Sequence, residues 1–240
     1  MPNSNINEVF QIKNQSENSA DVYFYGDIVA DSWDAWCDED QYPENVKNLL
    51  SGCQDKNLNI YINSGGGSVF AGIAIYNILK RHSGKKTVYV DGIAASIASV
   101  IALAGDEIII PKNAFFMIHK PWTMCIGNAD DLRKEIEVLD TIEQSMLFVY
   151  EEHLREEVDI KTVAKLMDAE TWLTGEQAAE YFNVTVGDEK QIAACADMSR
   201  FKNAPDALKH KQQTKANARL VDKKLSQIKS LCISGMTKGV

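Results

Sequence analysis

The chain has 240 residues, of which 45% are hydrophobic and 25% charged, with a formal net charge of −9. This length fits one large domain, or one domain with an appended tail. The balance of hydrophobic and charged residues excludes a collagen-like, a largely disordered and a membrane-embedded chain. The acidic balance makes the protein as a whole a poor nucleic-acid binder.

The cysteines and the N-terminal sequence indicate a cellular compartment. The five cysteines are odd in number and form no Cys-x-x-Cys pair, which indicates free thiols in a reducing environment and no zinc site. The N-terminus lacks the basic and apolar regions of a secretory signal, and the longest mostly apolar run, 93–105, is shorter than the ~20 residues that span a bilayer. We therefore expect a cytoplasmic protein with no membrane partner.

Charge divides the chain into three parts. Residues 1–18 are polar and without period, which predicts a flexible N-terminal arm, followed by a domain over 19–197. Residues 198–240 hold ten Lys or Arg and two Asp, a net charge of +8 that leaves −17 on residues 1–197. This basic C-terminal tail is expected to be partly helical, with one face formed by Val221, Leu225, Ile228 and Cys232.

Strands and helices alternate along the domain. The pattern predicts strands at 22–29, 57–64, 86–92, 107–111 and 113–121. It predicts helices at 68–82, 93–105 and 129–156, the last one capped by Asn128 with two Asp in its first turn. The acid-rich segment 31–45 is expected to form the solvated start of a helix. This alternation indicates an α/β fold with mainly parallel strands and one long helix.

Four pieces of the sequence could carry chemistry, and each has a plain structural alternative. The glycines of 63–67 could let a backbone approach a ligand or could form a tight turn, and they do not make a Walker A loop. Ser96, at an expected helix start, could be a cap or a nucleophile beside backbone N–H groups. His119 ends a strand, where it could be structural. Glu170 or Asp168 could orient a histidine, whereas Thr174 with Gln177 fits a capping box.

In this order the pieces resemble the ClpP family of caseinolytic serine peptidases, over about residues 21–188. INSGGGSVFAGIAIY resembles its oxyanion strand and the following helix, and GIAASIAS its nucleophile motif. FFMIHKP resembles its histidine motif, and ETWLTGEQAAEYF the segment with its third catalytic residue. The resemblance implies a ClpP/crotonase-like ββα superhelix with a long handle helix.

The resemblance also implies a serine endopeptidase. It places the nucleophile at Ser96, the base at His119 and the third residue at Glu170, with Asp168 as the alternative because the family carries Asp where this chain has Glu170. It implies oxyanion donors at the N–H groups of Gly67 and Ile97. Substrate would pair with the segments that contain Gly66, Ser68, Val69, Trp122 and Thr123. No metal and no organic cofactor is expected.

Partners and subgroup follow from the same resemblance. It implies a polypeptide substrate, a homo-oligomer of stacked heptameric rings, and an AAA+ ATPase or phage capsid and scaffold proteins as candidate partners. Gly65 stands where the family commonly has proline, and PWTMCIGN lacks the family's paired glycines. These departures, with the acidic insertion and basic tail, resemble the phage and prophage subgroup of head maturation proteases.

Two other interpretations compete. Crotonase-type acyl-CoA enzymes share the superhelix and its oxyanion glycines but need no Ser and His at these places. A non-catalytic assembly or scaffold protein on the same fold could use the basic tail to bind nucleic acid or an acidic surface.

Overall fold

The computed structural model describes residues 12–13, 16–35, 37, 39–188, 200–205 and 208. Its chain divides into two units, Met1–Ala196 and Asp197–Val240, and the fold below belongs to the first. The helical face predicted in the basic tail lies outside the described residues, as does most of the predicted N-terminal arm. Among the residues that the structure describes, no helix is long and apolar enough to cross a membrane.

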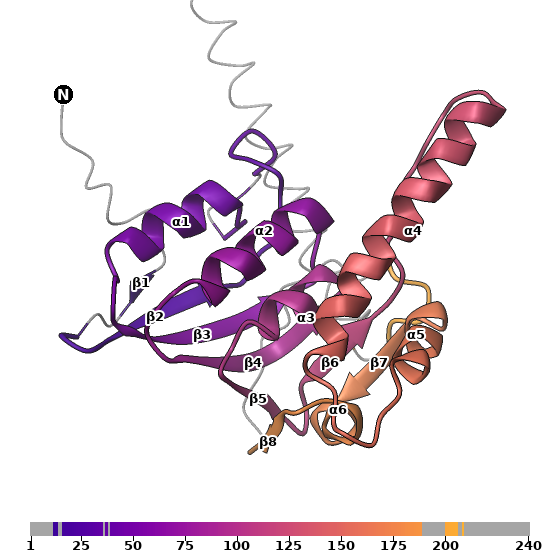
Figure 1. Cartoon of the computed structure of the whole chain (residues 1–240). Helices are drawn as coiled ribbons and strands as arrows, with labels where there is room; N and C mark the ends of the chain where they lie inside the picture. Colours follow the sequence, from indigo (N-terminus) through magenta and orange to yellow (C-terminus); the bar gives the residue numbers. More distant parts are fainter. Residues whose placement is uncertain are drawn as a thin grey trace, which may run out of the picture. The chain divides into compact units, whose positions relative to one another are not determined.

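A mostly parallel sheet forms the centre of this unit (Figure 1). Its main path runs in the order β1-β2-β3-β4-β5-β8, with β6 paired to β4 and β7 paired to β6. All of these pairs are parallel except β1 with β2 and β7 with β6. The predicted α/β class is therefore confirmed. The strands are β1 (Ile12–Lys13), β2 (Ser19–Phe24), β3 (Asn57–Ser64), β4 (Lys86–Ala95), β5 (Glu107–Pro111), β6 (Phe115–Ile118), β7 (Thr171–Thr174) and β8 (Thr185–Gly187).

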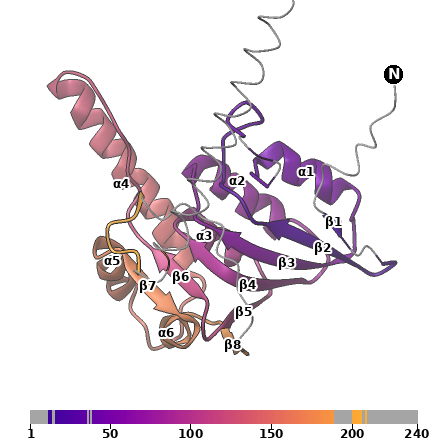
Figure 2. The ribbon, with the colours of Figure 1, turned by 180° about the vertical axis from the view of Figure 1, so that it is seen from behind.

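The helices that follow the strands complete the layers. They are α1 (Pro43–Ser51), α2 (Val69–Lys80), α3 (Ile97–Ala102), α4 (Ala129–Glu151), α5 (Ile160–Asp168) and α6 (Gly175–Tyr181). Both ribbon views show α1 and α2 on one side of the sheet (Figures 1 and 2). Their buried Leu49, Ile75 and Leu79 join the strand residues Ile60 and Val88 in one apolar core. Burial of this aliphatic surface is the main term that holds the helices on the sheet.

Several boundaries differ from the prediction. Strand β2 ends at Phe24, before the end of the predicted strand, and helix α1 begins only at Pro43, near the end of the acid-rich segment. Residues 93–95 continue β4, because they pair with β6 instead of starting the predicted helix. Helix α4 ends at Glu151, five residues early, because the His153 N–H donates to the Tyr150 carbonyl and Leu154 then bridges to Phe182. Ile12–Lys13, inside the predicted arm, pairs antiparallel with β2. Both predicted caps, at Asn128 and Thr174, are present as capping boxes.

Strand β4 changes its neighbour along its length. Its first half pairs with β5 over residues 87–89, and its second half pairs with β6 over residues 93–95. The register between β3 and β4 shifts between Ile62 and Ser64, where β4 takes up two extra residues. As a result, β6 lies beside the carboxyl end of β4. In an open α/β sheet, a crevice at such a branch point is where ligands commonly bind.

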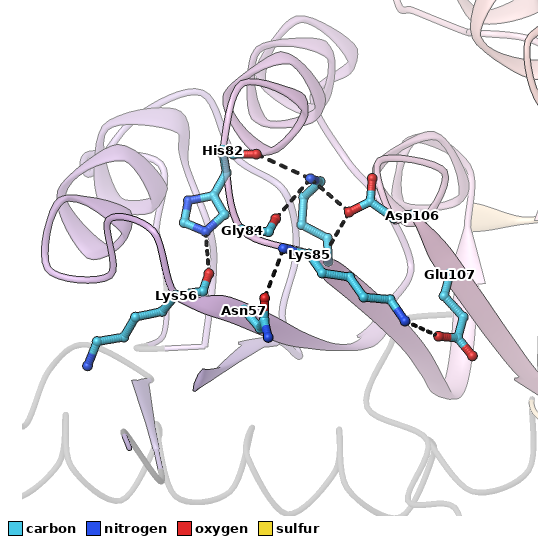
Figure 3. Close-up of polar contacts among 8 residues, drawn as sticks. Lys56, Asn57, His82, Gly84, Lys85, Asp106 and Glu107 are labelled. Atoms are coloured by element: carbon cyan, nitrogen blue, oxygen red, sulfur yellow. Dashed lines mark hydrogen bonds and ion pairs between the residues drawn. The ribbon is translucent and has the colours of Figure 1, made fainter. Parts of the chain in front are cut away.

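The amino edge of the sheet is tied together by a buried lysine, Lys86, the first residue of β4. Its ammonium donates to the carbonyls of His82 and Gly84, each at 3.2 Å, and lies 3.0 Å from a carboxylate oxygen of Asp106; Figure 3 labels these three partners. The Lys86 backbone N–H donates to the same oxygen at 2.7 Å. The ammonium is thereby satisfied although its side chain is only 6% exposed. This cluster fixes the loop before β4 against the start of β5.

Helix α4 extends beyond the sheet. Only Met146, Val149 and Tyr150, in its last turns, are buried. The rest of the helix projects from the body of this unit, and the segment 120–128 runs beside it (Figures 1 and 2). Several large apolar side chains on this arm are exposed: Trp122, Met124, Ile126, Leu132, Ile136, Val138 and Phe148.

Candidate active site

Ser96 lies at the turn between β4 and α3, in a strained backbone conformation. Its φ is 57° and its ψ is −130°, a region that residues with a Cβ rarely occupy. The Ser96 N–H donates to the Met117 carbonyl of β6 at 2.9 Å, which ties the turn to the neighbouring strand. Strain of this kind costs about 1–3 kcal/mol and tends to occur at functional positions. A serine on a sharp strand-to-helix turn is also the arrangement of many hydrolase nucleophiles.

His119 is the residue that meets Ser96. Its Nε2 lies 2.7 Å from Ser96 Oγ, and both residues are buried. The sheet explains this proximity. Ala95 pairs with Met117 in the parallel β4–β6 ladder, so the residues that follow the two strands emerge at the same edge. The two residues that the sequence singled out, 23 positions apart, are therefore brought together.

The structure decides between a capping role and a free hydroxyl for Ser96. An ordinary N-cap serine accepts a backbone N–H of the first helical turn with its side chain. Ser96 makes no such side-chain bond, because the Ser99 N–H donates to the Ser96 carbonyl at 3.0 Å. The helix start is thus satisfied through the backbone, and Oγ is left to His119. The capping alternative is wrong for Ser96.

The glycine loop touches the serine turn directly. Gly66 has a φ of 84°, and a Cβ placed on it would lie 2.7 Å from the Ala95 carbonyl oxygen and 2.8 Å from Ser96 Cβ. Any larger residue would push the loop away from Ser96. Ser64 Oγ supports the loop by accepting the Gly66 N–H at 3.1 Å and donating to the Gly26 carbonyl at 2.6 Å. The loop is therefore more than a tight turn.

The two predicted oxyanion donors are the N–H groups of Gly67, which follows the loop residue that touches Ser96, and of Ile97, which follows Ser96 itself. Gly67 forms a parallel β-bridge with Ile28. The Ile28 N–H donates to the Gly66 carbonyl, and the Ser68 N–H donates to the Ile28 carbonyl. In such a bridge the N–H of the central residue points away from the partner strand. Ile97 is the first residue of α3, where backbone N–H groups have no intrahelical acceptor. A helix start and a glycine loop of this kind suit a developing negative charge.

The two acidic candidates lie in different surroundings. Strand β7 is antiparallel to β6 with Thr171 opposite Ile118, so Glu170 occupies the next position in register, opposite His119. Glu170 has a φ of 50°, a second strained residue at this edge. The Asp168 carboxylate instead forms an ion pair with Lys120 Nζ at 2.7 Å, with 55% of its side chain exposed. Register favours Glu170 beside the histidine.

The predicted substrate-contacting residues belong to two segments of the chain, 66–69 and 122–123. Ser68 caps α2 by accepting the Ala71 N–H, and Val69 begins that helix. Trp122 and Thr123 are exposed in the segment between β6 and α4. Among the described residues, no group of three or more His, Cys, Asp or Glu could hold a metal ion.

Fold and geometry define an α/β protein with a hydrogen-bonded serine–histidine pair at the carboxyl edge of its parallel strands. The family model described as Clp protease matches residues 37–184. Because this match covers more than half of the 240 residues, the chain belongs to the Clp protease family.

Curated relatives agree with this family. The chain is 32% identical over 129 residues to an "ATP-dependent Clp protease proteolytic subunit" of Bacteroides thetaiotaomicron, covering 52% of this chain and 57% of that protein. A protein of the same name from Chlorella vulgaris is 34% identical over 131 residues, 53% of this chain and 64% of that protein. An "ATP-dependent Clp protease proteolytic subunit 1" from Streptomyces avermitilis is 31% identical over 138 residues, which cover 55% of this chain and 62% of that protein. The chain thus spans less than two thirds of the length of these relatives.

Two buried hydroxyl groups beneath Ser96 were missed from the sequence. Ser99 Oγ lies 2.6 Å from the Ser96 carbonyl oxygen and 2.8 Å from the Tyr150 hydroxyl. The available signal was a second serine one helical turn after Ser96, in a run otherwise made of small and aliphatic residues. No signal in the sequence pointed to Tyr150, because only the packing of α4 on α3 brings it there.

Proposed function

We propose that this protein is a serine endopeptidase that uses Ser96 as its nucleophile and His119 as its general base. The observation that carries the proposal is the 2.7 Å contact between Ser96 Oγ and His119 Nε2, made from a strained strand-to-helix turn. Membership of the Clp protease family supports it. A structural serine needs neither the strain nor a histidine partner.

The reaction follows from this geometry. Ser96 Oγ attacks the carbonyl carbon of the scissile peptide while His119 Nε2 takes the hydroxyl proton. The N–H groups of Gly67 and Ile97 bind the oxyanion of the tetrahedral intermediate. The carbon–nitrogen bond then breaks as His119 gives its proton to the leaving amine. A water molecule, deprotonated by His119, hydrolyses the acyl-enzyme and returns Ser96 to its hydroxyl form.

Glu170 is proposed as the third member, which holds the imidazole and stabilises its charged form. Its register position opposite His119 supports this assignment over Asp168, whose carboxylate is already paired with Lys120. A glutamate serves in place of aspartate in some triads, because the role depends on geometry.

The substrate is proposed to be an extended polypeptide. The backbone of 66–69 on one side and of 122–123 on the other would pair with it, as a strand pairs with an exposed edge. Phe70, at the start of α2, is 71% exposed, and Trp122 is 60% exposed. Both could contact substrate side chains.

An oligomeric chamber is proposed from the projecting arm. Exposed apolar side chains gather on α4 and on the segment beside it, and such surfaces usually mark interaction sites. The names of the relatives include the word "ATP-dependent", which favours work with a separate AAA+ ATPase. Capsid maturation in a phage or prophage remains a narrower prediction that these relatives do not test.

A fluorophosphonate probe tests the proposal, because only an activated serine displaces its fluoride. The full chain would be labelled, digested and mapped by mass spectrometry, and the intact sample sized by native mass spectrometry. We expect one adduct on Ser96 in an oligomer. His119→Ala should abolish the adduct. Ser68, the nearby cap of α2, is the internal control and should stay unlabelled in every sample.

Absence of an adduct in a correctly assembled oligomer would refute the peptidase and favour the scaffold alternative. An adduct that persists in His119→Ala would refute the role of the histidine. Monomer alone under all conditions would refute the chamber but not the chemistry.

A further inference from the structure

Two hydroxyl groups lie buried in the apolar layer between α3 and α4. Ser99 on α3 and Tyr150 on α4 both have no exposed surface. Burying a hydroxyl group without a hydrogen bond is costly, so each needs a partner. Ser99 Oγ is bonded to the Ser96 carbonyl oxygen at 2.6 Å and to the Tyr150 hydroxyl at 2.8 Å.

The directions of these two bonds follow from the number of protons. A carbonyl oxygen can only accept, so Ser99 Oγ donates its single proton to the Ser96 carbonyl. Tyr150 must then donate to Ser99 Oγ. Burial raises the pKa of the Tyr150 hydroxyl, so the phenol keeps the proton that it donates. A directed relay therefore runs from α4 through Ser99 to the backbone of Ser96.

Packing alone does not explain these two residues. The neighbours of Ser99 on α3 are buried alanine, valine and isoleucine, and an alanine would fit among them. The Tyr150 ring packs on Phe182, with ring centroids 5.8 Å apart, and a phenylalanine would make the same contact. Only the hydroxyl groups distinguish the native residues from these apolar ones. The Ser99 hydroxyl bonds to the Ser96 carbonyl directly, and the Tyr150 hydroxyl acts on that carbonyl through Ser99.

The Ser96 carbonyl is the group whose orientation sets the strained turn. It accepts hydrogen bonds from both the Ser99 N–H at 3.0 Å and the Ser99 hydroxyl at 2.6 Å. These two bonds together fix the ψ angle of Ser96. With the carbonyl held, Oγ does not need to cap α3 and remains 2.7 Å from His119.

We propose that Tyr150 and Ser99 are positioning residues, which hold the Ser96 carbonyl and thereby keep its Oγ directed at His119. The inference rests on the proposed function of Ser96 as the nucleophile. It also ties the buried end of α4, whose other end projects from the body, to the reacting group.

The test uses the full chain with Tyr150→Phe, Ser99→Ala and the double variant. Tyr76→Phe is the matched control, because the Tyr76 hydroxyl also bonds to the end of α4, at Glu152 3.3 Å away, without contacting Ser96. Three properties would be measured: the rate of fluorophosphonate labelling, kcat and KM on a peptide, and hydrogen exchange of the Ser96 amide.

We expect Tyr150→Phe to slow labelling and lower kcat by about tenfold, the effect of one lost buried hydrogen bond. KM should stay within about twofold, because ground-state binding is unaffected. The double variant should lose little more than Ser99→Ala alone, since the relay acts as one unit. The Ser96 amide should exchange faster in Tyr150→Phe than in Tyr76→Phe.

Wild-type labelling rates in both Tyr150→Phe and Ser99→Ala would overturn the inference, as would an equal loss in Tyr76→Phe. If Tyr150→Phe does not fold, Ser99→Ala decides the question by the same measurements. If the wild type takes no label, the proposed function fails. The positioning role is then tested only by hydrogen exchange of the Ser96 amide. Equal exchange rates in Tyr150→Phe and Tyr76→Phe would count against that role.

Discussion

The two edges of the parallel strands differ in how their polar groups are arranged. At the amino edge, Lys86 is buried among two carbonyls and the Asp106 carboxylate, and the one positive φ angle of a non-glycine residue described there belongs to Asp55, in the loop before β3. At the carboxyl edge, Ser96 and Glu170 have positive φ angles. One edge holds the strands together, whereas the other holds reactive groups in costly conformations.

This difference has a physical reason. A buried charge is tolerated only where hydrogen bonds satisfy it, so removal of one partner from the cluster at the amino edge should destabilise the fold. A nucleophile must keep its hydroxyl free of local backbone partners, and the strained turn at Ser96 does this. Changes at the carboxyl edge should therefore alter the catalytic rate with little loss of stability. Changes at the amino edge should lower stability with little effect on the catalytic rate.

The sharpest test of the comparison is Ser96→Gly beside Ser96→Ala. Both should lower kcat by more than ~10⁴-fold, because the nucleophile is absent. Glycine takes a positive φ freely, so Ser96→Gly should be more stable than Ser96→Ala by about 1 kcal/mol. Peptide hydrolysis and chemical denaturation measure the two effects. Equal stability of the two variants would mean that the turn stores no strain.

The third catalytic residue comes next in expected size. Glu170→Gln should lower kcat by about 10²–10⁴-fold, because the imidazole loses the charge that orients it. Asp168→Asn removes an exposed ion pair with Lys120 and should cost less than about tenfold. Steady-state kinetics on one peptide substrate compares them. The opposite order would transfer the third role to Asp168.

At the amino edge, two neighbouring lysines form a matched pair. Lys86→Met leaves the His82 and Gly84 carbonyls without their donor and should lower the free energy of unfolding by about 1–3 kcal/mol. Lys85→Met removes only an exposed ion pair with Glu107 and should cost less than about 1 kcal/mol. Denaturant titration gives both values. A fall in kcat in folded Lys86→Met would contradict the separation of the two edges.

The smallest expected effect is a pH dependence of stability at Asp106. Partial burial by itself raises the pKa of this carboxyl, but hydrogen bonds from the Lys86 N–H and ammonium, with the ammonium charge, outweigh it and lower the pKa. A carboxyl with a lowered pKa in the folded state stabilises the fold above its unfolded pKa, and this contribution is lost as the pH falls through the folded value. Asp106→Asn should therefore lose less stability than the wild type between about pH 6 and pH 2.5. The measurement is the free energy of unfolding of both proteins across this pH range. Equal losses in the two proteins would contradict the prediction.

Local pattern was enough to predict several elements. Short apolar runs predicted β3 and β5, and the polar residues at Asn128 and Thr174 predicted two helix caps, which the structure shows as capping boxes. Residues 93–95 show where pattern fails. Their small apolar side chains suit a buried helix or a buried strand, and only the hydrogen bonds to β6 decide for the strand. The end of α4 was missed for a similar reason, because the bridge between Leu154 and Phe182 joins distant segments.

The sequence by itself determined the α/β class, the long helix and the positions of Ser96 and His119, because these depend on local periodicity and on motifs whose residues lie close together in the chain. The tertiary structure alone decided that the Ser96 hydroxyl meets His119 instead of capping α3, that Asp168 is paired with Lys120, and that Tyr150 reaches the serine turn through Ser99. Each of these is a contact between separate elements, and such contacts depend on strand register and helix packing, which no local pattern specifies.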